Sequence, residues 1–213
     1  MELLTIVEVV TQIVTYLMFA CGIPPCIDMY RTKSTKNMPF TYFAIGLLNA
    51  LSGLLYGYLA NLLPLVYVNS IGLSFNCVYI LVYLVVTRSK GTAIMQLVSV
   101  CSPLALYYKY ITSLGSSEEV VLNQLGAFMF CVTVCLMMST FLDGIQCVQE
   151  KSVDGLSRSM LLGGLSCALC WLIYGLMLKD FYIYAPNVIC IASSIWKIFL
   201  IFIYGGKKSK KIE

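Results

Sequence analysis

The sequence contains no histidine and few charged residues. Only 11% of its 213 residues are charged, whereas a soluble domain of this size carries roughly a quarter. Without histidine the chain lacks the commonest general base and the commonest metal ligand. The residues are 60% hydrophobic and the mean hydropathy is +0.87, which is more apolar surface than one soluble core can bury. These features argue against soluble enzymes and metalloproteins and indicate an integral membrane protein.

Acidic residues are absent from the middle of the long apolar runs. Glu8 lies near the outer end of the first run, and Asp28 and Asp143 lie near the cytosolic ends of two others. Proton-coupled carriers typically need an intramembrane carboxylate or histidine, and enzymes need grouped reactive side chains. We therefore predict no enzyme activity and no cofactor, and we expect passive movement of a neutral solute.

Ten cysteines are present, most of them inside apolar runs. Cys167 and Cys170 form a CxxC pair, but no second pair stands at zinc spacing, so we interpret them as packing residues and predict no metal site. The start, Met1–Glu2, lacks the basic segment of a signal peptide. The first apolar run is therefore expected to be a span of the mature protein.

Seven apolar runs have about the length that crosses a bilayer. They lie at about 4–26, 40–60, 63–87, 93–112, 122–142, 160–178 and 181–204. Lysine and arginine gather in the loops after the first, third, fifth and seventh runs, and the net charge of +4 comes from the C-terminus rather than from a nucleic-acid-binding patch. The positive-inside rule then places the N-terminus outside or in a lumen and the C-terminus in the cytosol. A plasma-membrane and a Golgi or endomembrane location both fit.

Residues 168–175, ALCWLIYG, repeat residues 50–57, ALSGLLYG, at an offset of 118. The same offset pairs Gly46 with Gly164 and Asn69 with Asn187. Three spans on each side then correspond, and span four is left as a connector. The offset predicts a first repeat at 1–90, a linker helix at 91–115, a second repeat at 116–206 and a basic tail at 207–213.

Because a single span connects them, both repeats cross the membrane in the same direction. The predicted fold class is therefore an all-α membrane protein with seven helices, arranged as two parallel three-helix bundles joined by a linker helix. Transporters built from such repeats hold their substrate near mid-membrane, between the halves.

Several segments resemble the SWEET (MtN3/saliva) sugar transporters, which are themselves known examples of parallel repeats. In chain order they are RTKSTKNMPF, LLNALSGLLYG, VNSIG, QEKSVDGLS, CWLIYGLMLKD and APNVICI. The resemblance implies a bidirectional sugar uniporter for mono- or disaccharides that works by alternating access. It implies a sugar and the lipid bilayer as partners and leaves a homo-oligomer open.

The resemblance also implies site residues. Asn69 and Asn187 would hydrogen-bond the sugar from the two halves, Trp171 would stack on it, and Gly53 would be the small position facing Trp171. The residues that match the outer gate are Tyr56, Gly57, Tyr174, Gly175, Asp180 and Pro186.

The cytosolic hinge prolines of the family are only partly kept. Pro24 or Pro25 fits the first of four positions, Pro39 lies three residues before the second, and the last two positions hold no proline. Hinged rocking at four prolines therefore does not transfer directly to this chain.

The residues by themselves leave alternatives open. Asn69 lies about 10 Å into its span at 1.5 Å per residue, where an amide serves either a neighbouring helix or a ligand. Trp171 serves either core packing or stacking on a sugar ring. A proton-coupled PQ-loop carrier is the first alternative function, although its Pro-Gln signature is missing. A seven-span receptor or cargo-binding protein is the second.

Overall fold

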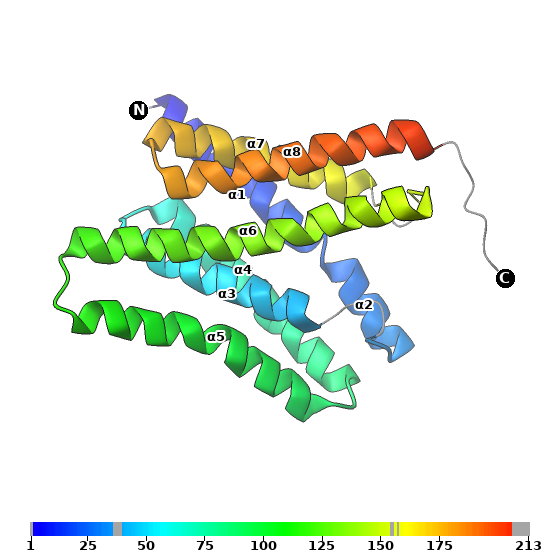
Figure 1. Ribbon diagram of the computed structural model, residues 1–213, viewed down its shortest axis with the longest axis horizontal. Helices are drawn as coiled ribbons and strands as arrows, with labels where there is room; N and C mark the ends of the chain where they lie inside the picture. The colour runs from blue at the N-terminus through cyan, green and yellow to red at the C-terminus, as the bar shows by residue number, and fades with distance from the viewer. Residues whose placement is uncertain (1, 36–39, 154–155, 157, 206–213) are drawn as a thin grey trace. The chain divides into compact units, whose positions relative to one another are not determined.

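The computed structural model describes residues 2–35, 40–153, 156 and 158–205, and these residues form eight α-helices (Figure 1). Pro39 and the predicted tail at 207–213 lie outside the described residues. The helices are α1 Glu2–Ala20, α2 Ile23–Thr32, α3 Phe40–Leu59, α4 Leu63–Val86, α5 Lys90–Ser113, α6 Glu118–Glu150, α7 Arg158–Leu178 and α8 Phe181–Tyr204. Because α1 and α2 form one apolar stretch, the described residues provide seven helices long and apolar enough to cross a membrane.

The observed helices follow the predicted spans, with two differences. The first span is broken after Ala20 because Pro24 and Pro25, at the start of α2, have no N–H to donate to the preceding turn. Helix α6 continues eight residues beyond the predicted end at 142. Its last turns are polar and are supported locally, since Gln146 Nε2 donates to Glu150 Oε1 at 2.7 Å.

Two compact units make up the chain: residues Thr15–Thr133 form one, and Met1–Val14 with Val134–Glu213 form the other. Each unit is described by itself below. The boundaries of these units fall inside α1 and α6. The predicted division into repeats at 1–90 and 116–206, with a linker at 91–115, stays a prediction.

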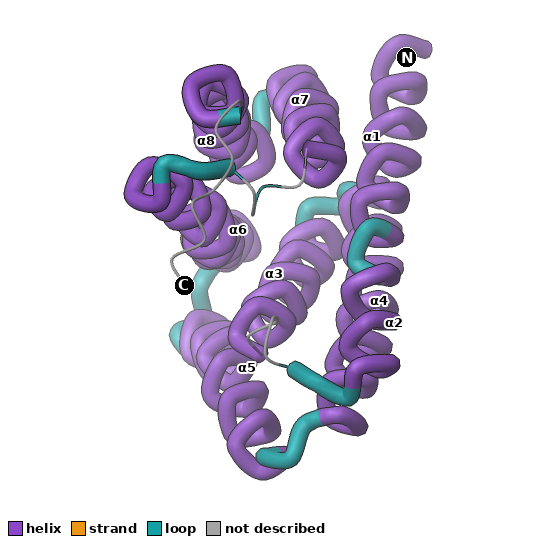
Figure 2. The backbone as a smooth tube through the Cα atoms, turned by 90° about the vertical axis from the view of Figure 1, so that its right-hand side faces the viewer, coloured by secondary structure: helices purple, strands orange, loops and turns teal. Residues whose placement is uncertain are grey.

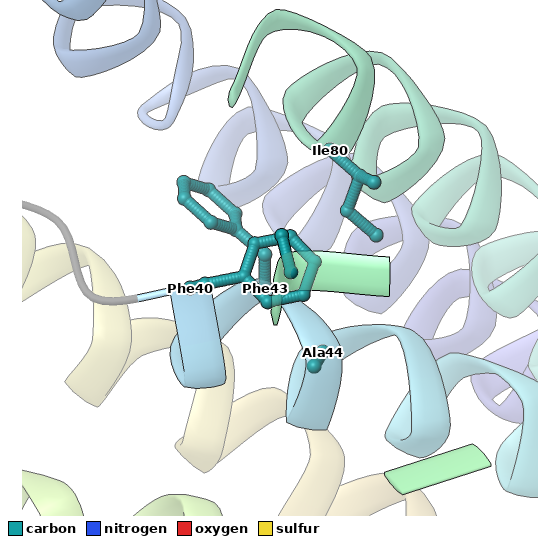
Figure 3. Packing of buried hydrophobic residues seen from close by; sticks show 5 residues of the cluster. Phe40, Phe43, Ala44 and Ile80 are labelled. Carbon is teal, nitrogen blue, oxygen red and sulfur yellow. The ribbon is translucent and has the colours of Figure 1, made fainter. Parts of the chain in front are cut away.

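Within Thr15–Thr133, α3 packs against both α4 and α5, and α2 packs against α4 (Figure 2). The best-buried cluster contains Phe40, Phe43 and Ala44 of α3 with Ile80 of α4 (Figure 3) and Ala93 of α5. Close packing of this kind associates helices in a membrane, where lipid tails are as apolar as the side chains.

The break between α1 and α2 is bridged by a side chain from α4. The hydroxyl of Tyr79 donates to the backbone carbonyl of Phe19 at 2.7 Å, which also accepts the N–H of Gly22 at 3.1 Å. A side chain at position 22 would meet the Tyr79 ring at 2.8 Å, so glycine makes room for it. The Phe19 carbonyl, in the last turn of α1, thus accepts from two donors at the break.

In the other unit, α7 packs along α8. Lys197 of α8 is buried, and its Nζ lies 3.6 Å from Asp143 Oδ2 of α6. The buried ammonium thus has a carboxylate partner on a neighbouring helix.

The backbone itself repeats at the offset of 118. Among the residues that the structure describes, four non-glycine residues have positive φ. Lys33 (52°) and Lys151 (50°) form one pair, and Asn61 (55°) and Lys179 (56°) form the other. In both helical hairpins a Schellman-type bond ends the first helix, from Leu62 N to Gly57 O and from Asp180 N to Gly175 O. The two copies therefore share turn geometry although their turn residues differ.

We expect Tyr79→Phe to destabilise the protein by about 0.5–1.5 kcal/mol, because it leaves a carbonyl at the α1–α2 break without the hydroxyl donor. Thermal unfolding in detergent measures the effect. Tyr83→Phe is the matched control, since its ring, like that of Tyr79, packs on Phe43. Equal melting temperatures for Tyr79→Phe and the wild type would contradict the assignment.

Candidate functional site

Asn69 lies in α4 and is 9% exposed. Its Nδ2 donates to the carbonyl of Leu65 at 2.8 Å, one turn back in the same helix. No other described residue bonds its side chain. The amide is thus oriented by its own helix, and its Oδ1 is left as an acceptor.

Asn187 adopts the same conformation in α8. Its Nδ2 donates to Ile183 O at 2.6 Å, and no other described residue bonds this amide. Both predicted sugar-binding asparagines therefore donate one amide hydrogen to a backbone carbonyl of their own helix. Each keeps one N–H and one carbonyl oxygen, the combination that a hydroxyl group can both donate to and accept from.

Gly53 of α3 makes the space that the Asn69 amide occupies. A Cβ on Gly53 would lie 2.7 Å from Asn69 Oδ1 and 2.8 Å from Nδ2. The family resemblance implies that Gly53 is a small position facing Trp171. The structure shows it covered by the amide of its own hairpin, while Gly53 and Trp171 belong to different units. That Gly53 faces Trp171 stays a prediction.

Trp171 stands at the position of α7 that corresponds to Gly53. It is half-buried, and its ring meets that of Tyr174 edge-on, with centroids 5.7 Å apart. Close contact of Gly175 with Ile183 fixes the antiparallel register of α7 and α8. Trp171 lies four residues before Gly175 in α7, and Asn187 lies four residues after Ile183 in α8. This register therefore places Trp171 opposite Asn187 in the same hairpin.

The predicted outer-gate residues lie where the two hairpins turn. Tyr56 and Tyr174 are buried, at 4% and 1% exposure. A Cβ on Gly57 would meet Leu65 at 3.1 Å, and one on Gly175 would meet the backbone nitrogen of Tyr184 at 2.7 Å. Tight hairpin packing explains both glycines.

The two remaining predicted gate residues lie at the start of α8 and within it. Asp180 is the N-cap and accepts from Tyr182 N at 3.0 Å, and Pro186 is buried inside the helix. The hydrogen bond gives Asp180 a structural role at the helix start. The gating role of the whole set stays a prediction.

The Asp143–Lys197 ion pair was not predicted from the sequence. The repeat offers a signal in retrospect, because Lys197 corresponds to Tyr79 and Asp143 to Pro25. Tyr79 bonds the Phe19 carbonyl in one copy and Lys197 pairs with Asp143 in the other, so this one position carries a polar link in both copies while its partner differs. Among the described residues no group of three or more His, Cys, Asp or Glu side chains could hold a metal ion.

Comparison with known proteins adds to this geometry. The family profile described as "Sugar efflux transporter for intercellular exchange" (MtN3_slv) matches residues 5–91 and 123–209. The chain belongs to the MtN3/saliva, or SWEET, family. The two matched segments begin 118 residues apart (123 − 5), which is the offset of the sequence repeat.

Individual SWEET proteins resemble the chain over nearly its full length. Sugar transporter SWEET1 of Mus musculus is 34% identical over 91% of this chain and 88% of its own length. The Danio rerio protein of the same name is 31% identical over 97% and 94%.

A solved eukaryotic SWEET transporter shares the fold, with a TM-score of 0.85, 22% identity, and coverage of 96% of this chain and 97% of that one. The predicted seven-helix, 3+1+3 fold class is confirmed. The SWEET family consists of transporters and not enzymes, so this chain is a transporter.

Gly53→Ala should lower stability by about 1–3 kcal/mol, because the added methyl overlaps the Asn69 amide. The same substitution in an Asn69→Ala background should cost much less, since the amide is gone. A double-mutant cycle of thermal unfolding measures this coupling. Gly91→Ala is the control, because a Cβ there meets nothing within 4 Å. Additive effects would show that Gly53 and Asn69 are not packed as described.

Proposed function

We propose that the protein is a facilitative, bidirectional sugar uniporter. It carries mono- or disaccharides down their gradient by alternating access. The sugar is held mid-membrane between the two repeats, by Asn69 from one and by Asn187 and Trp171 from the other. Its N-terminus faces the outside or a lumen and its C-terminus the cytosol, in the plasma membrane or the Golgi and endomembranes.

The observation that carries this proposal is the shared conformation of the two asparagines. In each, Nδ2 donates to the carbonyl four residues back, at 2.8 Å in Asn69 and 2.6 Å in Asn187. A purely structural asparagine in a membrane gains most by bonding to another helix. These two amides instead keep their bonds inside their own helices, which leaves a donor and an acceptor on each for a hydroxylated solute.

Trp171 supports the same conclusion through the register of its hairpin. It lies level with Asn187, so an aromatic face and an amide occur at one depth. Such a pair suits a sugar ring, which has apolar C–H faces and hydroxyl edges. The mouse and zebrafish relatives are named sugar transporters, which agrees with a sugar as the solute.

Purified protein in liposomes tests the function directly. Labelled sugar should enter and leave the vesicles and stop at equal concentrations on both sides. Asn69→Ala and Asn187→Ala should each raise the half-saturation concentration about fivefold, the loss expected for about one hydrogen bond, and the double variant should lose most transport. Wild-type kinetics in the double variant would overturn the site assignment.

The Asp143–Lys197 ion pair bears on the alternative of proton coupling, because proton relays use intramembrane carboxylates. For a uniporter, an imposed pH gradient should drive no sugar accumulation above the external concentration. Asp143→Asn should lower stability, since it leaves a buried ammonium without a counter-charge, yet equilibration of sugar should persist. Accumulation that follows the pH gradient and disappears in Asp143→Asn would favour the proton-coupled carrier.

A further inference from the structure

A third asparagine, Asn76, repeats the arrangement of Asn69 at a second level of α4. Its Nδ2 donates to the carbonyl of Gly72, four residues back, at 2.9 Å. No other described residue bonds its side chain, which is half-buried. Asn76 therefore keeps the same donor and acceptor as Asn69 and Asn187.

A glycine opposes this amide as well. A Cβ on Gly46 of α3 would lie 2.8 Å from Asn76 Oδ1, just as a Cβ on Gly53 would lie 2.7 Å from Asn69 Oδ1. The two glycines are seven residues apart, and so are the two asparagines. The antiparallel hairpin thus contains two successive glycine–asparagine pairs.

Helix geometry relates the two levels. Seven residues rise by about 10 Å and turn by nearly two full turns, so Asn69 and Asn76 lie on the same face of α4. Asn76 is the one nearer the end of α4 that leads to Arg88 and Lys90, which the proposed orientation places in the cytosol.

We propose that Asn76 is an inner sugar-binding residue on the cytosolic side of Asn69. A sugar hydroxyl donates to its Oδ1 and accepts from its second Nδ2 hydrogen, as the sugar passes between the Asn69 level and the cytosol. The inference rests on the proposed sugar transport and adds a second polar contact to the route through the first repeat.

The second repeat does not reproduce this contact. The position equivalent to Asn76 is Ser194, which is buried at 6% exposure. Opposite it in register is Gly164, where an added Cβ would meet nothing within 4 Å. The inner amide therefore comes from one repeat only. Because it lies on the Arg88 side of Asn69, its loss should affect sugar from that side of the membrane more than sugar from the other.

Transport kinetics from each face test the proposal in liposomes that hold the protein in one orientation. Asn76→Ala should raise the half-saturation concentration for sugar presented on the Arg88 side about threefold to tenfold. From the opposite side it should change by less than about twofold. Ser74→Ala is the matched control, because this hydroxyl is exposed on another face of α4 and bonds only Ser70 O among the described residues.

A double variant separates sugar contact from packing. In Gly46→Ala with Asn76→Ala, the added methyl occupies the space that the amide leaves, so the hairpin is packed again. If Asn76 binds sugar, this double variant should still have a raised half-saturation concentration for sugar presented on the Arg88 side. Recovery of wild-type kinetics in the double variant, or equal changes from both faces in Asn76→Ala, would overturn the proposal.

Asn69→Ala, measured in the same liposomes, shows whether a negative result concerns Asn76 alone or the proposed function as well. Impaired transport in Asn69→Ala together with unchanged kinetics in Asn76→Ala would refute the role of Asn76 and leave the proposed function standing. A wild-type protein that does not equilibrate sugar would refute both.

Discussion

Hydrogen bonding of an asparagine to its own helix is the interaction on which this structure depends. An amide in hydrocarbon is costly unless it is paired. Asn69 and Asn187 pair one N–H with the carbonyl four residues back. Each amide is thereby fixed in direction while its second N–H and its carbonyl oxygen are kept. A polar group that is both tolerated by the membrane and available to a solute is the basic requirement of a sugar carrier.

Glycine makes this arrangement fit between closely packed helices. In the α3–α4 hairpin, Gly53 and Gly46 leave room for the amides of Asn69 and Asn76. In the α7–α8 hairpin, Trp171 replaces the first glycine while the asparagine opposite is kept. One hairpin thus places an amide in a narrow space, and the other places an aromatic face level with its amide.

The two copies also differ where the first helix of each approaches the third. One copy has a proline pair, a broken helix and a tyrosine hydroxyl that donates to the carbonyl of Phe19. The other has a continuous α6 and an ion pair from Asp143 to Lys197. The position shared by Tyr79 and Lys197 therefore makes a neutral hydrogen bond in one copy and an ion pair in the other.

The sequence by itself determined the seven spans, the repeat at 118 and the family, because these depend on apolar length and on ordered motifs. The two asparagines proposed to bind sugar were predicted from the same motifs. The tertiary structure alone decided that Gly53 is covered by Asn69, that Trp171 lies level with Asn187 and that Lys197 has a carboxylate partner. Those features depend on the register of antiparallel helices and on side-chain direction, and neither follows from the order of residues along one helix.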